Sequence, residues 1–296
     1  MYHLAWISPR KKYKKAFIVP FITRLVDLLG EKLIFIDELY FDLPVEEWPK
    51  SLFCIPYLCS KVPVDKTRAY IEAGSKALCN IDIMLSLMDR RIMNDVLTDS
   101  RAPCIPLFDD PKSIEGPVIE KPLDAENHDV RIYYDNKTVF LHRKTKDRCS
   151  FEEENSCIYR SNEEMVYSPL CSAINNLDIK VYAFNFNDGK DEVFAESRPS
   201  PVHNHFVQRD ENGQEKREAV QLTAQEREEA LRIAENCEHL VCGMDLLRYT
   251  ENGVMKHAWI DINGFSVVKR HPDALEMLAE KMFEHVNSLV NEHSKD

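Results

Sequence analysis

The sequence is poor in glycine, with only eight glycines among 296 residues. Neither GxxxxGK[ST] nor GxGxxG occurs anywhere in it. These glycine-rich loops let backbone N–H groups surround the phosphates of a nucleotide in P-loop and Rossmann proteins. Their absence excludes both kinds of phosphate site by motif.

Long apolar runs and paired cysteines are also missing. No stretch of eighteen apolar residues occurs, so no membrane-spanning helix is expected. The first apolar stretch precedes the first basic cluster, which is the reverse of the order in a signal peptide. The nine cysteines are scattered without a CxxC pair, as is typical of reduced thiols. We therefore expect a cytoplasmic protein without a disulfide framework or a zinc site.

The net charge of −12 is unevenly spread, because the first thirty residues carry six Lys and Arg against one Asp. An acidic chain of this kind lacks the broad basic face of a general nucleic-acid binder. A compact basic cluster suits a small, dense polyanion, although composition alone favours a solvated basic turn. We expect no nucleic-acid, membrane or obligate protein partner.

Three zones are predicted along the chain. Residues 1–82 alternate short apolar runs with helical stretches, which predicts a small α/β domain with a parallel sheet. Residues 83–172 begin with one amphipathic helix over 83–97, and strands follow, with an acidic loop predicted between Phe151 and Glu164. Residues 173–296 form the third zone. The predicted fold class is therefore mixed α/β and α+β.

Local signals in the third zone are specific. Thr223 and Glu226 form a capping-box pattern that predicts a helix start. Asn252-Gly253 between two strand-like runs predicts a hairpin. Pro272 marks the start of a last helix, where its missing N–H costs nothing.

The hairpin carries candidate metal ligands. Asp261 and Asn263 are two residues apart on a strand, so they share one face. Reflection about the turn places Asp245 opposite residue 260, and a one-residue bulge or a longer turn would bring it beside Asp261. The clustered oxygen donors would then suit Mg²⁺. Alternatively, Asp245 caps a bend and Asp261 pairs with a nearby cation; spacing alone leaves both interpretations open.

Two lysines interrupt predicted strands, Lys121 and Lys180. A half-buried ammonium needs an anionic partner, because an unpaired one is costly. A structural carboxylate would serve either lysine, and so would a nucleotide phosphate. Two such lysines in one chain with a carboxylate hairpin favour the phosphate.

Longer segments resemble a known family, in the same order along nearly the whole chain. They include VCGMDLLRY, WIDINGFSVVK, IEKPLDAENHDVRIYY, LHRK, NLDIKVYAF, FAESRPSP, VQRDENGQEKRE, LMDRR, EEWP and SKVPVDK. These segments are similar to the kinase domain of the diphosphoinositol pentakisphosphate kinases. The resemblance implies an ATP-grasp fold, with a small N-terminal α/β domain and two lobes that clamp ATP. It implies transfer of the γ-phosphate of ATP, with Mg²⁺, to inositol hexakisphosphate or diphosphoinositol pentakisphosphate.

The resemblance also implies roles for individual residues. Metal ligands would be Asp245, Asp261 and Asn263, and both aspartates would thereby contact ATP. Lys121 and Lys180 would contact the ATP phosphates, and His128 and Arg143 would lie beside the γ-phosphate. Arg198, Arg217, Ser266 and Lys269 would lie near the transferred phosphate and the inositide, with Lys180 and Arg217 counted with His128 and Arg143 as catalytic. Further basic contacts would come from Arg10, Lys11, Lys12, Lys61, Lys144 and Arg209. Arg90 and Arg91 would be near the site or on a solvated helix face.

The sequence departs from the family pattern at three places. A short turn at Asp135-Asn136-Lys137 replaces a glycine-rich stretch, Tyr167-Ser168-Pro169 replaces an acidic hinge, and one basic residue is lost at Ser197-Arg198-Pro199. Three alternatives therefore stay open: a kinase of less phosphorylated inositols, an ATP-grasp carboxylate–amine ligase, and a non-catalytic inositide sensor. A phosphate acceptor is already anionic, so the lack of an obvious general base fits a kinase of highly phosphorylated inositols.

Overall fold

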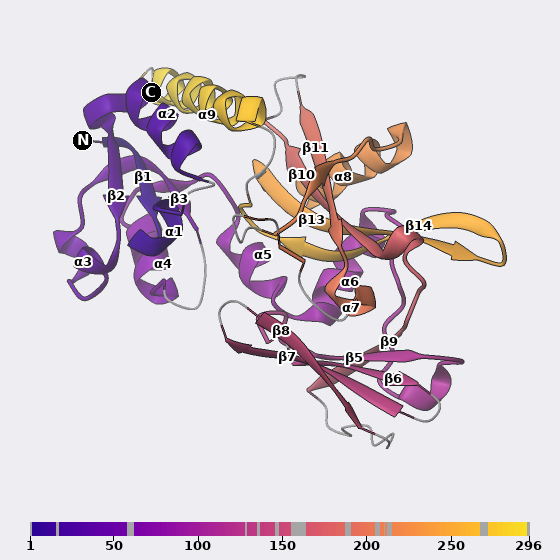
Figure 1. The fold of residues 1–296 in the computed structure, drawn as a ribbon. Helices are drawn as coiled ribbons and strands as arrows, with labels where there is room; N and C mark the ends of the chain where they lie inside the picture. The colour runs from indigo at the N-terminus through magenta and orange to yellow at the C-terminus, as the bar shows by residue number, and fades with distance from the viewer. Residues whose placement is uncertain are drawn as a thin grey trace.

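Figure 1 shows the chain as a computed structural model with three β-sheets and helices between and beside them. The structure describes residues 2–15, 18–57, 62–127, 129–134, 137–145, 148–154, 164–186, 191–204, 208–209, 211, 215–266 and 272–294. Each sheet is formed by strands that are near one another in sequence.

The N-terminal sheet is parallel, as predicted, with the strand order β2-β1-β3-β4. Apolar side chains of β1 such as Leu4 and Trp6 are fully buried under helix α2. The C-terminal helix α9 returns to this part of the molecule and lies against α2 in Figure 1. The elements are β1 (Tyr2–Ile7), α1 (Arg10–Tyr13), α2 (Val19–Leu29), η1 (Gly30–Lys32), β2 (Leu33–Ile36), α3 (Glu38–Phe41), η2 (Val45–Glu47), β3 (Ser51–Pro56), α4 (Val64–Glu72), β4 (Lys76–Ala77) and α9 (Pro272–His293).

The segment predicted as one helix over 83–97 forms two, so that prediction was wrong. Helix α5 (Ile81–Ser86) ends, and α6 (Arg90–Asp99) begins after Asp89. The carboxylate of Asp89 accepts hydrogen bonds from the backbone N–H groups of Arg91 and Ile92, which starts a new helix. As a consequence Arg90 is buried, and its Nε donates to the carbonyl of Pro122. The solvated helix face suggested for both arginines describes Arg91, which pairs with Asp109. It does not describe Arg90.

The second sheet is antiparallel, with the order β8-β7-β6-β5-β9. The prediction of a loop between Phe151 and Glu164 was wrong for the first part of this segment, because Phe151–Glu154 is paired with β7. Backbone pairing with a neighbouring strand outweighs the low strand propensity of the acidic residues there. The elements are η3 (Pro111–Ser113), β5 (Val118–Pro122), β6 (Val130–Tyr134), β7 (Lys137–Thr145), β8 (Arg148–Glu154) and β9 (Met165–Pro169).

The third sheet is antiparallel, with the order β12-β11-β10-β13-β14, and it confirms the local predictions. Both halves of the capping box at Thr223 and Glu226 are present. Asn252 and Gly253 adopt φ of 51° and 76°, the positive values that a two-residue hairpin turn requires. The elements are η4 (Ile174–Asn176), β10 (Leu177–Phe184), β11 (Glu192–Pro199), α7 (Pro201–Asn204), β12 (Glu218–Ala219), α8 (Ala224–Asn236), β13 (Val241–Glu251) and β14 (Val254–Asn263).

The third sheet has one apolar face and one polar face around β10. Ile179 and Val181 are buried in a cluster with α8 and α6, whereas Asp178 and Lys180 alternate with them and lie on the other face. Packing therefore crosses the predicted limits at residues 82 and 172, because α6 packs on the third sheet and α9 on the first. The three-zone division stays a prediction. Within the described ranges, every helix is too short or too polar to cross a membrane.

Candidate functional site

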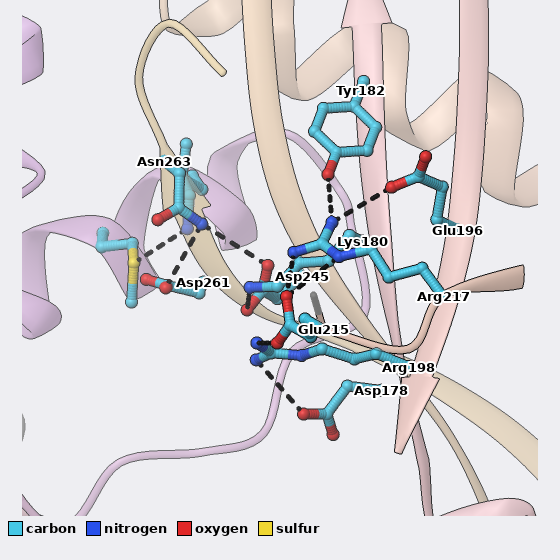
Figure 2. Close-up of polar contacts among 12 residues, drawn as sticks. Asp178, Lys180, Tyr182, Glu196, Arg198, Glu215, Arg217, Asp245, Asp261 and Asn263 are labelled. Carbon is cyan, nitrogen blue, oxygen red and sulfur yellow. Dashed lines mark hydrogen bonds and ion pairs between the residues drawn. The ribbon is translucent and has the colours of Figure 1, made fainter. Parts of the chain in front are cut away.

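A β-bulge in the hairpin brings two carboxylates together. Asp245 on β13 is the cross-strand partner of Asp261 on β14, yet the next pair is Leu246 with Trp259. Ile260 is therefore the extra residue, so that the bulge, and not a longer turn, brings the two aspartates together. Asp245 and Asp261 lie side by side in Figure 2, with Asn263 beyond them.

The bulge also decides which way Asp261 faces. Trp259 and Ile262 are three residues apart, yet both are buried in the cluster under α8. Strict alternation would place them on opposite faces of the sheet. The extra residue interrupts the alternation of side chains along β14. As a result, Asp261 lies with Asp245 on the polar face instead of entering the core.

The donor set at this position fits a divalent cation. Asn263 Nδ2 lies 3.4 Å from an oxygen of Asp245 and 3.4 Å from an oxygen of Asp261. Burial raises the pKa of Asp261, and the neighbouring charge of Asp245 raises it further. Such a pair of carboxylates is relieved by a hard cation, and the amide of Asn263 can supply a third oxygen. Within the described residues, no group of three or more His, Cys, Asp or Glu side chains is arranged for a metal.

Two lysines face this carboxylate pair. Lys180 on β10 is the cross-strand partner of Asp245, and its Nζ donates to Oδ2 of that residue. Burial lowers the pKa of Lys121 on β5 to about 8, and the nearby charge of Arg90 lowers it further. The carboxylate of Asp261 acts in the opposite sense on Lys121. Both ammonium groups therefore lie beside carboxylates at a place where a phosphate could also neutralise them.

The arginines predicted near the inositide form a buried ion-pair network (Figure 2). Arg198 pairs with Glu215 at 2.7 Å and with Asp178 at 3.5 Å. Arg217, whose side chain is only 5% exposed, pairs with Glu215 and with Glu196, at 3.1 Å, and donates to the hydroxyl of Tyr182.

Burial disfavours ionisation of Glu215, but Arg198 and Arg217 outweigh it and hold the pKa of its carboxyl well below its ordinary value. The three carboxylates of this network, Asp178, Glu196 and Glu215, were not among the predicted site residues. The alternation of Asp178, Lys180 and Tyr182 along β10 was a usable signal for one of them.

A pocket of about 360 Å³ adjoins the carboxylate pair. It brings the predicted residues Lys12 and Ser266 to the same cavity as Asp261 and Asn263. Tyr57, Met84, Glu126 and Phe265 also line it. A larger pocket of about 640 Å³, between β4, α5 and α9, contains none of the predicted residues. Convergence of chemically suitable side chains, and not volume, therefore marks the site.

Other predicted residues are not brought to this pocket. Arg10 on α1 pairs with Asp37, the residue that caps α3, at 2.8 Å, and Lys11 and Arg209 are exposed. Three predicted residues lie outside the described part of the chain, namely Lys61, His128 and Lys269. Arg143 and Lys144 are on β7, but their side chains are not described. The roles suggested for all of these residues stay predictions.

Solved structures establish the fold. The ATP-grasp ligase PsnB, in complex with a precursor variant, Mg and ADP, is similar with a TM-score of 0.62 and 11% identity over 96% of this chain and 99% of its own. D-alanine–D-alanine ligase from Bacillus anthracis, in complex with ATP, has a TM-score of 0.59 and 13% identity over 98% of both chains. The expected ATP-grasp fold is confirmed. No protein-family model matches the sequence.

Sequence relatives are more specific. The chain is 32% identical to inositol hexakisphosphate and diphosphoinositol-pentakisphosphate kinase 1 of Rattus norvegicus, over 82% of this chain and 18% of that protein. The corresponding kinase of Caenorhabditis elegans is 29% identical over 88% of this chain and 22% of its own length. The chain thus spans about a fifth of the length of these curated relatives. Built on the ATP-grasp fold, it is a relative of the inositol hexakisphosphate and diphosphoinositol-pentakisphosphate kinases across four-fifths of its sequence.

Proposed function

We propose that this chain transfers the γ-phosphate of ATP to a highly phosphorylated inositol, either the hexakisphosphate or diphosphoinositol pentakisphosphate. The observation that carries the proposal is the pairing of Asp245 with Asp261 across the bulge, within reach of Asn263 and Lys180. The named activity of the sequence relatives supplies the substrate class.

Nucleotide binding is assigned to the polar face of the third sheet. Lys180 and Lys121 would hold the ATP phosphates, because both are cations placed beside carboxylates that a metal would neutralise. Asp245, Asp261 and Asn263 would hold Mg²⁺, which when bound offsets negative charge on the phosphates. His128 and Arg143 are proposed to lie beside the γ-phosphate.

The acceptor is assigned to the pocket of about 360 Å³ next to Asp261. Lys12 and Ser266 line it and would contact inositide phosphates. Phosphoryl transfer depends mainly on in-line positioning and charge neutralisation, and a phosphate nucleophile needs no general base. Further positive charge is proposed to come from Arg10, Lys11, Lys61, Lys144, Arg209 and Lys269.

Arg198 and Arg217 are proposed to act first through their ion pairs. Each guanidinium is held by carboxylates, so direct contact with the acceptor would require one of these pairs to open. While these ion pairs are formed, the two arginines hold β10 and β11 together beside Lys180.

The test is ADP release by the wild-type protein with Mg²⁺ and ATP. One series of acceptors is a panel of inositol phosphates with one to six phosphates, and the second is a set of amino acids. We expect ADP release to require an inositide with at least five phosphates. Release with sparsely phosphorylated inositols would replace the proposed acceptor, and amino-acid-dependent release would identify a ligase instead.

A further inference from the structure

Helix α8 turns two buried carboxylates toward the hairpin that carries the metal ligands. Glu226 and Glu229 are each only 2% exposed. Glu226 accepts from Nε and Nη2 of Arg248 on β13, at 2.8 and 2.7 Å. Glu229 Oε2 is 2.7 Å from His257 Nε2 and accepts from the indole Nε1 of Trp259 at 2.9 Å, both on β14. One helix thus binds both strands of the hairpin.

These contacts fall directly beside the bulge. Arg248 and His257 are cross-strand partners, and two pairs further along, Leu246 faces Trp259. The residue after Trp259 is the extra residue Ile260, and Asp261 follows it. Trp259 is therefore the last residue of β14 in regular pairing with β13 before the bulge shifts the register.

Trp259 is held from three directions. Its indole donates to Glu229, its backbone N–H donates to the carbonyl of Pro103 at 2.7 Å, and its ring is fully buried. If β14 slipped by one residue, Asp261 would turn away from Asp245 toward the core. Anchoring the indole opposes that slip, because moving it would break the buried hydrogen bond to Glu229 and leave the indole N–H without its acceptor.

We propose that Glu229 is a positioning residue for the metal ligand Asp261. It acts through Trp259, which sets the bulge and so the pairing of Asp261 with Asp245. The inference rests on the proposed function, since it assumes that these two aspartates bind the metal. Residues that orient metal ligands change metal affinity by about 10- to 100-fold when they are replaced.

The test compares Glu229→Ala with Glu229→Gln and with a matched control. Gln keeps the volume and one acceptor oxygen for the Trp259 indole, so it should restore most of what Ala removes. The control is Glu228→Ala, because Glu228 is the preceding residue on the same helix but is exposed and forms a surface ion pair with Arg232. Folding of each variant is checked by circular dichroism.

The readout is the affinity for Mn²⁺ in the presence of a non-hydrolysable ATP analogue, measured by electron paramagnetic resonance without turnover. We expect Glu229→Ala to weaken Mn²⁺ binding by about 10- to 100-fold, with Glu229→Gln and Glu228→Ala close to wild type. A lower melting temperature with unchanged Mn²⁺ affinity would show a merely structural role and overturn the inference.

If Glu229→Ala does not fold, a second variant tests the same inference. Trp259→Phe removes the indole N–H but keeps most of the buried ring, and it should weaken Mn²⁺ binding in the same way; unchanged affinity would overturn the inference. The proposed function is tested separately, because a wild-type protein that binds Mn²⁺ and the analogue but phosphorylates no inositide would contradict that proposal alone. If Asp261→Asn leaves Mn²⁺ affinity unchanged, Asp261 is not a ligand and the role of Glu229 falls with it.

Discussion

Gly243 lies so close to Ser266 that a Cβ atom built on the glycine would be 2.5 Å from the Cβ of the serine. It would also lie 3.3 Å from the backbone oxygen of Asn263. The chain between Asn263 and Ser266 can therefore cross β13 at this distance only where β13 has no side chain. This crossing carries a predicted metal ligand and a wall of the proposed acceptor pocket together.

Gly243→Ala should push the segment from Asn263 to Ser266 out of place. We expect a loss of about 1–3 kcal/mol in the free energy of unfolding, as for other overpacked positions, and a higher KM for the inositide. Urea unfolding and steady-state kinetics measure the two effects. Adding Ser266→Gly removes the nearest clashing atom and should recover much of the stability. A Gly243→Ala protein with unchanged stability and KM would contradict this account of the crossing.

Asp261→Asn should abolish phosphotransfer while the fold is kept. The change replaces the carboxylate of a proposed metal ligand with an amide of almost the same volume, so the rate should fall by roughly three decades or more. Glu251→Gln is the matched control, because Glu251 is an exposed carboxylate at the far end of the same hairpin and pairs with Lys256. Turnover within a few-fold of wild type in folded Asp261→Asn protein would remove the hairpin from the mechanism.

Lys180→Met distinguishes the two interpretations of this strand lysine. If Lys180 binds ATP phosphates, the loss of its charged hydrogen bonds should raise the Kd for ATP by about ten-fold or more and lower kcat. If it serves only as the partner of Asp245, stability should fall with little change in ATP affinity. Isothermal titration with ATP, alongside thermal unfolding, separates these results.

The ion pairs of Glu215 predict how stability depends on pH. Arg198 and Arg217 hold the folded pKa of this carboxyl well below its ordinary value, so its contribution is present above the ordinary Glu pKa of about 4.3. The contribution should be lost as the pH falls below that value. Glu215→Gln should therefore be destabilised, by roughly 3 kcal/mol, near neutral pH and by progressively less in acid. A difference that is constant with pH would show that these pairs are not what Glu215 contributes.

Some of the fold and site could be predicted from the sequence, because the signals were local. The capping box at Thr223 and the turn at Asn252 follow from residue type and spacing, whereas spacing alone left open whether a bulge or a longer turn brings Asp245 beside Asp261. Two positions could not be predicted in this way. Asp89 interrupts an amphipathic pattern that continues on both sides, and the burial of Arg90 depends on a carbonyl more than thirty residues away.

The ion-pair network of Glu215 depends on contacts between residues that are far apart in the sequence. Glu215 lies in a charged stretch that reads as a solvated loop, yet it joins two arginines on the polar face of the third sheet. No local pattern distinguishes it from its acidic neighbours. Only the antiparallel pairing of β10 with β11 brings Asp178 to Arg198 and Lys180 to Glu196.

The central claim is that a phosphate of a highly phosphorylated inositol accepts the γ-phosphate of ATP. The most direct measurement is phosphorus NMR of the product after incubation of inositol hexakisphosphate with Mg²⁺, ATP and the wild-type protein, with Asp261→Asn as the inactive control. We expect new diphosphate resonances on the inositol product, formed in proportion to ADP. ATP that is bound but not consumed, or a product with only phosphate monoester resonances, would contradict it.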